Sequence, residues 1–334
     1  MHTALRSFGS VSKARRLDEG ERLYKLVVAP IQADIEGFRT LIFALDGALH
    51  YVPFATLRYA DLGQSVFLVQ RYDIAVTPSI QMFLQPAAPA PPAARQMLLV
   101  DDPVYDRLDS RVSKVVPDLQ SSEPALALVR GATPGTNLPR LPGAAREAAA
   151  IAALMNAGSV DRLDGFAANR DRFLTSGLER YRLIHVATHA RTDSEIPQAS
   201  ALILSTVDAA GKEVDGRVLA ADFVGVRLRA DTVVLSACDT ALGKRVAGEG
   251  LIGLQYVVLA RGARSVVSSL WPAIDRATAD VMVKFYSVLL HQHTSVISAW
   301  SAASRAALEG PYGDPGIWGA FMLTLSHVDD VSSP

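Results

Sequence analysis

The sequence has very little cysteine and no long apolar segment. Cys238 is the single cysteine among 334 residues, so neither an internal disulfide nor a zinc site built on cysteines can form. No uninterrupted apolar run reaches the about 18 residues that a membrane-spanning helix needs. The first residues also lack the apolar stretch of a signal peptide. We therefore expect a cytoplasmic protein that contacts no membrane.

An excess of charge of either sign is also missing. The 33 lysine and arginine residues nearly balance the 34 acidic residues, which leaves a formal net charge of -1. Direct contact with nucleic acid is therefore not expected. With 49% hydrophobic and 20% charged residues, the composition is that of a globular chain that can bury a sizeable core.

The pattern along the chain changes three times. Residues 1–22 are polar and predict an arm or a helix, and residues 23–85 carry short strand-like runs. The Asp-Gly pair at 46–47 separates two of these runs and is typical of a hairpin, so a small antiparallel layer is expected there. Residues 86–96 are rich in proline and alanine and predict a linker. Over residues 97–334 apolar strands alternate with helices, which predicts an α/β domain with a mostly parallel sheet covered on both faces.

Two of the predicted parallel strands end in residues that can carry chemistry. The strand RLIHVATHA carries His189 near its end, and the strand DTVVLSAC ends at Cys238. In open α/β sheets, ligands bind beyond the carboxyl ends of the strands, so both side chains are expected at one edge. A thiol beside an imidazole is what nucleophilic catalysis needs. A buried structural cysteine and a histidine that caps backbone groups are the alternative interpretation of these residues.

Three other motifs allow weaker interpretations. His185 and His189 stand four residues apart, but on a strand they lie about 13 Å apart, so no metal site is predicted. Residues 248–253 match G-x-G-x-x-G, yet they follow their strand by about ten residues and contain Glu249, which disfavours nucleotide binding. A nucleotide-dependent enzyme stays as a rival hypothesis. Asp275 is expected either to bind a basic side chain of a substrate or to cap a helix.

Taken together, several segments resemble the CHAT family of caspase-like cysteine peptidases. The similarity runs from about Leu23 to the C-terminus, and the segments that carry it include LIHVATHA, DGRVLAADF, VVLSACDTALG, GEGLIGL, RSVVSSLWPAIDRATADVMVKFYSVL and WGAFML. It implies a caspase-like α/β/α sandwich in which residues 23–85 form the N-terminal portion of the CHAT region and a smaller flanking layer.

The resemblance also implies a role for individual residues. The catalytic dyad is His189 and Cys238, rather than His185, and the backbone N–H groups of Cys238 and Ala190 form the oxyanion hole. Asp275 contacts a basic P1 side chain of the substrate. The groove around it is lined by further residues, namely Ser268, Ser269 and Trp271. No metal and no organic cofactor takes part.

The function that the resemblance implies is that of a cysteine endopeptidase acting on a protein or peptide substrate. Members of this family often follow tetratricopeptide repeats, so we expect the chain to be the C-terminal piece of a longer bacterial protein. An upstream repeat region or a regulatory protein is then expected to gate the peptidase. A catalytically silent caspase-like scaffold that binds a partner is the alternative hypothesis.

Overall fold

A computed structural model describes the fold over residues 12–61, 63–85, 95–112, 138–191, 196–237, 248–271, 275–292, 294–311 and 313–327. Within these ranges the chain folds around a ten-stranded sheet. Its main path follows, in spatial order, β1 (Thr40–Ala44), β4 (Asp73–Thr77), β12 (Phe321–Leu325), β11 (Ser265–Ser269), β10 (Thr232–Ala237), β7 (Tyr181–Arg191), β5 (Arg95–Asp101) and β6 (Val160–Asp164).

Most neighbouring strands of this sheet are parallel, as the sequence predicts. The exception on the main path is the pair of β11 and β12, which is antiparallel. Two short strands, β8 (Ala201–Ile203) and β9 (Arg217–Leu219), continue antiparallel from the end of β7. The two strands form a hairpin, and η8 (Ala220–Gly225) follows β9.

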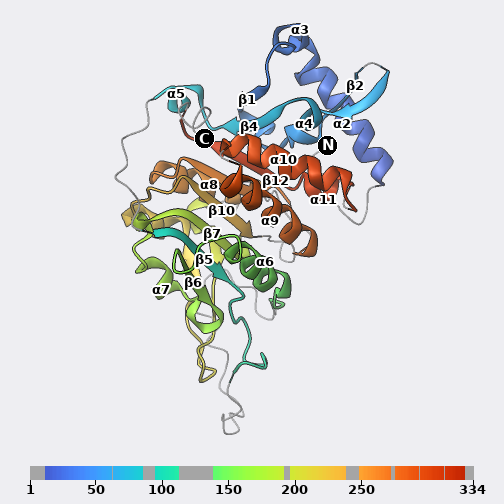
Figure 1. Cartoon of the computed structure of the whole chain (residues 1–334). Helices are drawn as coiled ribbons and strands as arrows, with labels where there is room; N and C mark the ends of the chain where they lie inside the picture. Colours follow the sequence, from blue (N-terminus) through green and yellow to red (C-terminus); the bar gives the residue numbers. More distant parts are fainter. Residues whose placement is uncertain are drawn as a thin grey trace.

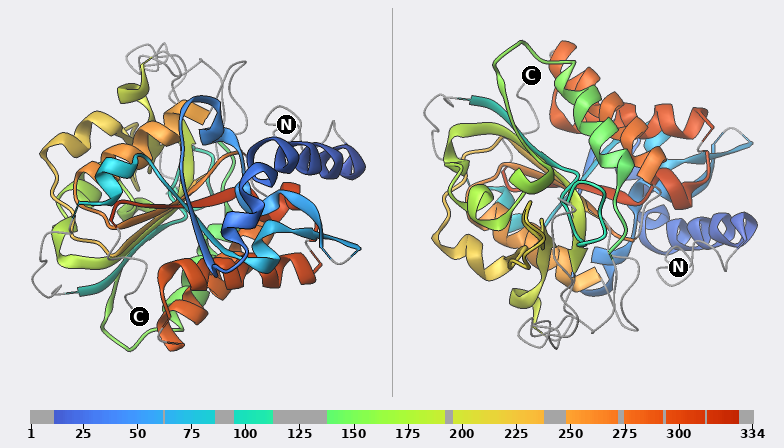
Figure 2. Two further views of the ribbon diagram at one scale, coloured as in Figure 1. Left: turned by 90° about the horizontal axis from the view of Figure 1, so that it is seen from above. Right: turned by 90° about the horizontal axis from the view of Figure 1, so that it is seen from below.

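Helices cover both faces of the sheet (Figures 1 and 2). On one face α6 (Pro142–Ala152), α9 (Asp275–His291) and α10 (Val296–Glu309) share a core with alternate strand residues such as Met97 and Leu99. The other face packs against α7 (Arg170–Leu174), α8 (Gly248–Ala260) and η8, and it takes the intervening residues, such as Leu98 and Val100. A strand that is buried on both sides needs an unbroken apolar run, which explains the sequence pattern. The α/β/α sandwich is confirmed.

The N-terminal part adds to both the sheet and its flank. The predicted helix at the start is found as α2 (Lys13–Val27), followed by η1 (Ala29–Ile31) and α3 (Gln32–Ile35), while residues 1–11 lie outside the described ranges. An antiparallel pair, β2 (Arg58–Asp61) and β3 (Gln64–Phe67), forms a separate small sheet. The remaining short helices are η2 (Gly47–Tyr51), η3 (Phe54–Thr56), α4 (Leu68–Arg71), α5 (Ile80–Phe83), η5 (Gly165–Ala167), η6 (Leu178–Arg180), η7 (Pro197–Ala199) and α11 (Pro315–Trp318).

The hairpin predicted at residues 46–47 is wrong. Gly47 does take a positive φ of 53°, but it opens the helical turn η2, and β1 pairs in parallel with the distant strand β4. An Asp-Gly pair supplies a positive φ to several kinds of turn, so it does not by itself specify a hairpin. Residues 86–94 of the predicted linker lie outside the described ranges, and β5 begins at Arg95, so the linker stays a prediction.

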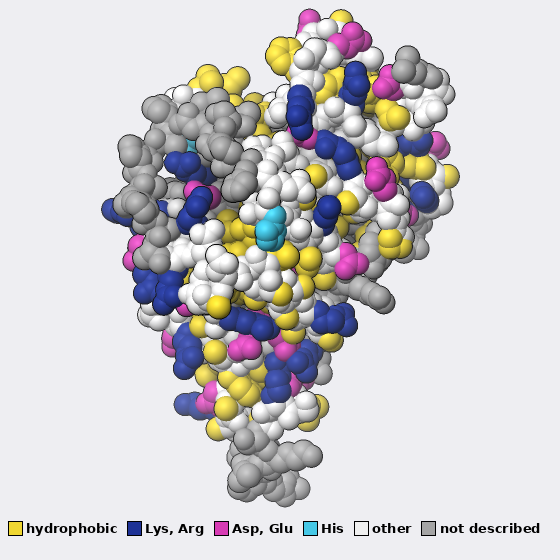
Figure 3. All heavy atoms as spheres, in the orientation of Figure 1, with side chains coloured by type: hydrophobic (Ala, Val, Ile, Leu, Met, Phe, Trp, Pro, Cys, Tyr) yellow, Lys and Arg dark blue, Asp and Glu magenta, His cyan; other side chains and the backbone are white. Residues whose placement is uncertain are grey.

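Two further properties concern the surface. Basic and acidic side chains lie interspersed on the face that Figure 3 shows. Within the described part of the chain, no helix is long and apolar enough to cross a membrane.

Candidate active site

The carboxyl ends of β7 and β10 lie side by side in the sheet. The two strands are parallel neighbours, and their register pairs Ala237 with Thr188. The prediction that these strands end at the same edge is therefore confirmed. His189 comes directly after Thr188. Cys238 comes directly after Ala237 in the chain and lies outside the described residues.

The imidazole of His189 is held by a backbone carbonyl. The side chain is largely buried, with the residue 8% exposed, and Nε2 lies 2.8 Å from the carbonyl oxygen of Pro139. A carbonyl oxygen can only accept a hydrogen bond, so Nε2 carries the proton and donates it. In a neutral imidazole this leaves Nδ1 without a proton, which is the form that can act as a base.

Tyr105 packs against the same imidazole. The two ring centroids are 5.0 Å apart and the rings are tilted by 59°. The Tyr105 hydroxyl lies 2.8 Å from Thr188 Oγ1, and its backbone carbonyl accepts a hydrogen bond of 2.8 Å from Thr206 Oγ1. Burial raises the pKa of the Tyr105 hydroxyl, so it stays neutral at physiological pH. The ring of Tyr105 thus borders the imidazole of His189 on one side.

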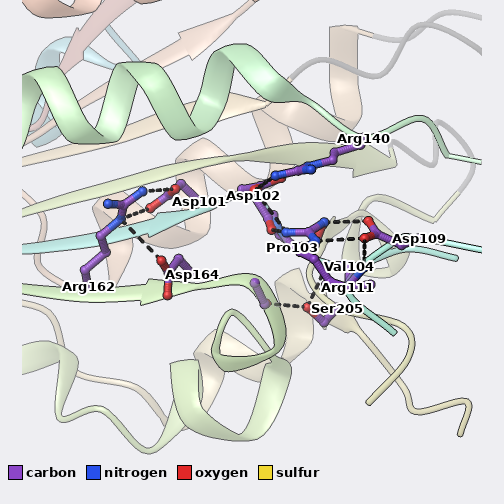
Figure 4. A network of polar contacts seen from close by, with 11 residues as sticks. Asp101, Asp102, Pro103, Val104, Asp109, Arg111, Arg140, Arg162, Asp164 and Ser205 are labelled. Atoms are coloured by element: carbon purple, nitrogen blue, oxygen red, sulfur yellow. Dashed lines mark hydrogen bonds and ion pairs between the residues drawn. The ribbon is translucent and has the colours of Figure 1, made fainter. Parts of the chain in front are cut away.

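A network of carboxylates and guanidinium groups follows β5 at this edge (Figure 4). Arg162 donates two hydrogen bonds to the carboxylate of Asp101, at 2.8 and 2.7 Å. Arg140 donates two hydrogen bonds to the carboxylate of Asp102 in the same way, at 2.8 and 2.6 Å. Asp102 has a φ of 47° and is the only described residue other than glycine with a positive φ, a conformation that costs about 1 kcal/mol.

Comparison with known proteins identifies the family at this point. Residues 17–326 match the sequence model of the CHAT domain. The chain belongs to the CHAT domain family. It is 25% identical over 92% of its length to tetratricopeptide repeat protein 28 of mouse (Mus musculus), and likewise to the human (Homo sapiens) protein of that name. The chain spans only 13% of the length of these relatives. Both relatives are mammalian, so the expected bacterial source stays a prediction.

A comparison with solved structures finds two cysteine proteinase structures that are similar to this CHAT domain. One is the Arg-specific cysteine proteinase gingipain R (RgpB), with a TM-score of 0.47 and 8% identity over 95% of this chain and 68% of that one. The other is the complex of Porphyromonas gingivalis RgpB pro- and mature domains, with a TM-score of 0.45 and 8% identity over 97% of this chain and 74% of that one. Both TM-scores lie below 0.5, so no property of these two structures is transferred to this chain.

Ala190, expected in the oxyanion hole of the CHAT domain, lies in ordinary strand backbone. It pairs with Leu202 of β8, and its φ is not positive. Alanine at this position therefore introduces no backbone strain. The role of its N–H group, like that of Cys238, stays a prediction.

Three residues expected to line the substrate groove are buried. Ser268, Ser269 and Trp271 are each 3% exposed. Ser268 bonds Gln255 of α8, Ser269 Oγ donates to the carbonyl of Ala237 at 2.9 Å, and the Trp271 indole donates to the carbonyl of Gly316 at 2.9 Å. Their polar atoms are thus occupied inside the protein. Direct contact of these side chains with a substrate stays a prediction.

The remaining candidates are placed as follows. Asp275 is the first residue of α9, and its side chain lies outside the described part, so both of its proposed roles stay open. The G-x-G-x-x-G match at 248–253 lies within α8, whereas a dinucleotide fingerprint forms the turn between strand and helix. Among the described residues, no group of three or more His, Cys, Asp or Glu side chains could hold a metal ion.

His185 is a core residue. It is fully buried, with Nε2 2.9 Å from Oε1 of Glu147 on α6 and Nδ1 3.3 Å from the Tyr286 hydroxyl on α9. These contacts tie two helices of one face to the central strand β7. Both ring nitrogens of His185 therefore have their partners inside the core, away from solvent.

Proposed function

We propose that this CHAT domain is a cysteine endopeptidase in which Cys238 is the nucleophile and His189 is the general acid and base. The observation that carries the proposal is the register of β7 and β10, which pairs Thr188 with Ala237. The next residues in the sequence are His189 and Cys238. Neighbouring parallel strands run about 4.8 Å apart, which is within reach of a thiol and an imidazole.

The alternation of side chains along the two strands supports the same pairing. Leu183 of β7 and Val234 of β10 both belong to the core on the α6, α9 and α10 face. Side chains two residues apart point to the same face of a strand. His189 and Cys238 are each an even number of residues from these two positions. We therefore propose that the side chains of His189 and Cys238 lie on the same face.

The chemistry that follows is acyl transfer. With Nε2–H directed at the Pro139 carbonyl, Nδ1 of His189 is the atom that takes the thiol proton and leaves Cys238 as a thiolate. The sulfur attacks the scissile carbonyl carbon, and the oxyanion is stabilised by the N–H groups of Cys238 and Ala190. As the C–N bond breaks, His189 protonates the leaving amine, and it then takes a proton from the water that hydrolyses the thioester.

We further propose that the substrate carries a basic P1 residue that Asp275 binds. The support is positional: Asp275 begins the helix that follows β11, and β11 is the parallel neighbour of β10. The groove would then be supported by three side chains whose polar atoms form hydrogen bonds within the protein, namely Ser268, Ser269 and Trp271.

A regulatory region upstream completes the proposal. The curated relatives are named for tetratricopeptide repeats, and the matched part is 13% of their length. We infer that a repeat region of this kind, or a partner that binds it, gates the peptidase, and that the protein acts in the cytoplasm.

The proposal is tested by profiling cleavage of a peptide library with the wild-type chain, Cys238→Ala and His189→Ala. Each substitution is expected to reduce turnover at least about 100-fold, because each removes a group that takes part in proton transfer or bond formation. Far-UV circular dichroism should show that both variants stay folded. Turnover that persists in a folded Cys238→Ala variant contradicts the proposal.

A thiol-reactive peptide probe distinguishes the peptidase from a silent scaffold. A peptidase is expected to be labelled at Cys238 far faster by a probe with a matching peptide than by the same reactive group without it. Equal rates for the two reagents would favour the scaffold. Selective loss of cleavage after Arg and Lys in Asp275→Ala would support basic P1 recognition, whereas equal loss at all P1 residues would point to helix capping.

A further inference from the structure

We propose that the ion pair between Asp102 and Arg140 positions the Pro139 carbonyl that holds the imidazole of His189. Asp102 and Arg140 are then positioning residues for the proposed peptidase. The proposal depends on the role of His189 stated above, but its first consequence, the orientation of the imidazole, can be measured without any substrate.

The carboxylate of Asp102 joins two segments that are distant in the sequence. Arg140 binds both of its oxygens, with Nε to Oδ1 at 2.8 Å and Nη2 to Oδ2 at 2.6 Å. Arg111 adds a contact of 2.9 Å to Oδ2 and donates from Nη1 to the Asp102 carbonyl at 2.8 Å. Figure 4 shows both guanidinium groups turned toward Asp102. A bidentate pair of this kind fixes direction as well as distance.

Arg111 is itself fixed, so the carboxylate of Asp102 has a rigid surround. Asp109 accepts hydrogen bonds from Arg111 Nε at 2.9 Å and from Nη2 at 2.6 Å. Asp102 is only 7% exposed and keeps a strained, positive φ directly after β5. Such strain is retained where the surrounding contacts determine the conformation. The backbone at the end of β5 and the two arginine side chains therefore fix the position of the Asp102 carboxylate.

The link from Arg140 to the imidazole is a single peptide unit. The Pro139 carbonyl and the Arg140 N–H belong to the same planar group, so the placement of Arg140 sets the direction of that carbonyl. Pro139 adds a φ that its ring locks. The carbonyl oxygen then accepts the Nε2 proton of His189 at 2.8 Å. Breaking the ion pair is expected to free the carbonyl and, with it, the tautomer and orientation of the imidazole.

The protein supplies a matched control one residue away. Arg162 binds Asp101 with the same bidentate geometry, at 2.8 and 2.7 Å. Both arginine side chains are partly exposed, 33% for Arg162 and 46% for Arg140. Arg162 lies on β6, however, and among the described residues its ion-pair partners are Asp101 and Asp164 rather than Asp102. Loss of either arginine removes one fork-shaped ion pair, but only loss of Arg140 disturbs the carbonyl that His189 uses.

The test compares Arg140→Gln, Arg140→Lys and Arg162→Gln by nitrogen NMR of histidine side chains. The chain has seven histidines, and His189→Gln assigns the signal of His189. In the wild type and in Arg162→Gln we expect a single Nε2–H tautomer of His189. In Arg140→Gln we expect a mixture of tautomers and faster exchange of the Nε2 proton. Arg140→Lys, which keeps the charge but not the fork, should fall between the two.

Kinetics of the same variants separate this proposal from the proposed function. For Arg140→Gln we expect kcat to fall about 10- to 100-fold with little change in KM, as is typical of a misplaced reacting group. An unchanged His189 tautomer in a folded Arg140→Gln variant overturns the positioning role, whatever the activity. A changed tautomer in a chain that never cleaves peptides supports the positioning role and counts against the peptidase instead.

Discussion

At the residue scale, Asp109 provides a clear dependence on pH. Hydrogen bonds from Arg111 hold the pKa of Asp109 at about 2, below its ordinary value of 3.8. A carboxyl group whose pKa is lower in the folded protein than in the unfolded chain stabilises the folded state at pH values above its unfolded pKa. This contribution to the free energy of unfolding disappears as the pH falls from about 4 to about 2. Asp109→Asn should therefore lower the free energy of unfolding by about 2 kcal/mol at pH 7, and by clearly less at pH 3.

Urea denaturation at the two pH values measures this difference. Asp171 serves as the control, because its side chain is 91% exposed and its only described ion pair, to Arg170, is long at 3.7 Å. Asp171→Asn is expected to change the free energy of unfolding by less than about 0.5 kcal/mol at either pH. A loss for Asp109→Asn that is equally large at pH 3 and pH 7 would show that the ion pair is not its origin.

The sequence could identify His189 but not the groups around it. His189 stands at the end of an apolar strand, which is a position with a functional expectation of its own. Pro139 is 50 residues away in the sequence, in a stretch without periodicity, and Tyr105 lies in the irregular segment after β5. Contacts made by such loops depend on how the chain closes in space, and no local pattern encodes them.

At the element scale, the end of α8 depends on one glycine. Gly262 has a φ of 111°, and a Cβ atom there would lie 2.3 Å from the carbonyl oxygen of Leu228. Because of this φ and this close approach, any residue other than glycine would force the backbone to shift. Gly262→Ala should lower the free energy of unfolding by about 2 kcal/mol or more, since strain and a backbone clash add. Thermal or urea unfolding measures it.

Gly225 is the matched control for this substitution. It ends η8, it has no positive φ, and a Cβ there meets nothing within 4 Å. Gly225→Ala is therefore expected to be neutral or slightly stabilising, by less than about 1 kcal/mol. Should the two variants prove equally stable, the turn between α8 and β11 would not be the constraint described here.

The sequence predicts helices and strands best where a regular pattern of apolar residues extends over many positions. The strands β7, β10 and β11 and the helices α8, α9 and α10 follow from unbroken apolar runs and from helical spacing. The spatial order of the strands did not follow, because pairing between β1 and β4, or between β12 and β11, joins segments that are far apart in the sequence. The wrong hairpin at residues 46–47 has the same origin, since local turn chemistry outweighed a distant partner.

At the scale of the whole molecule, one core crosses the predicted boundary between residues 23–85 and 97–334. Leu41 and Val76 of the first region pack in the same cluster as Trp300 and Phe321 of the second. Buried Asp73 of β4, 1% exposed, also pairs with Arg305 of α10. The domain limits themselves stay a prediction. The shared core leads us to expect that the two regions unfold together.

Equilibrium unfolding in urea tests this with two probes, tryptophan fluorescence and far-UV circular dichroism. We expect coincident transitions in the wild type. Arg305→Ala leaves the carboxylate of Asp73 without its main partner, and it should move both transitions to lower urea, by about 3 kcal/mol in free energy of unfolding. Two separate transitions, or a shift in only one of the probes, would mean that the regions fold independently.

The central claim is that Cys238 and His189 act as a pair, and the single cysteine makes it directly measurable. The rate of alkylation by iodoacetamide, followed by mass spectrometry of the intact chain across pH 5 to 10, reports the pKa of the Cys238 thiol alone. An imidazole within reach stabilises the thiolate, so the pKa of Cys238 should lie clearly below about 8.5 in the wild type and return toward that value in His189→Ala. Identical pH profiles for the two proteins would contradict the pairing.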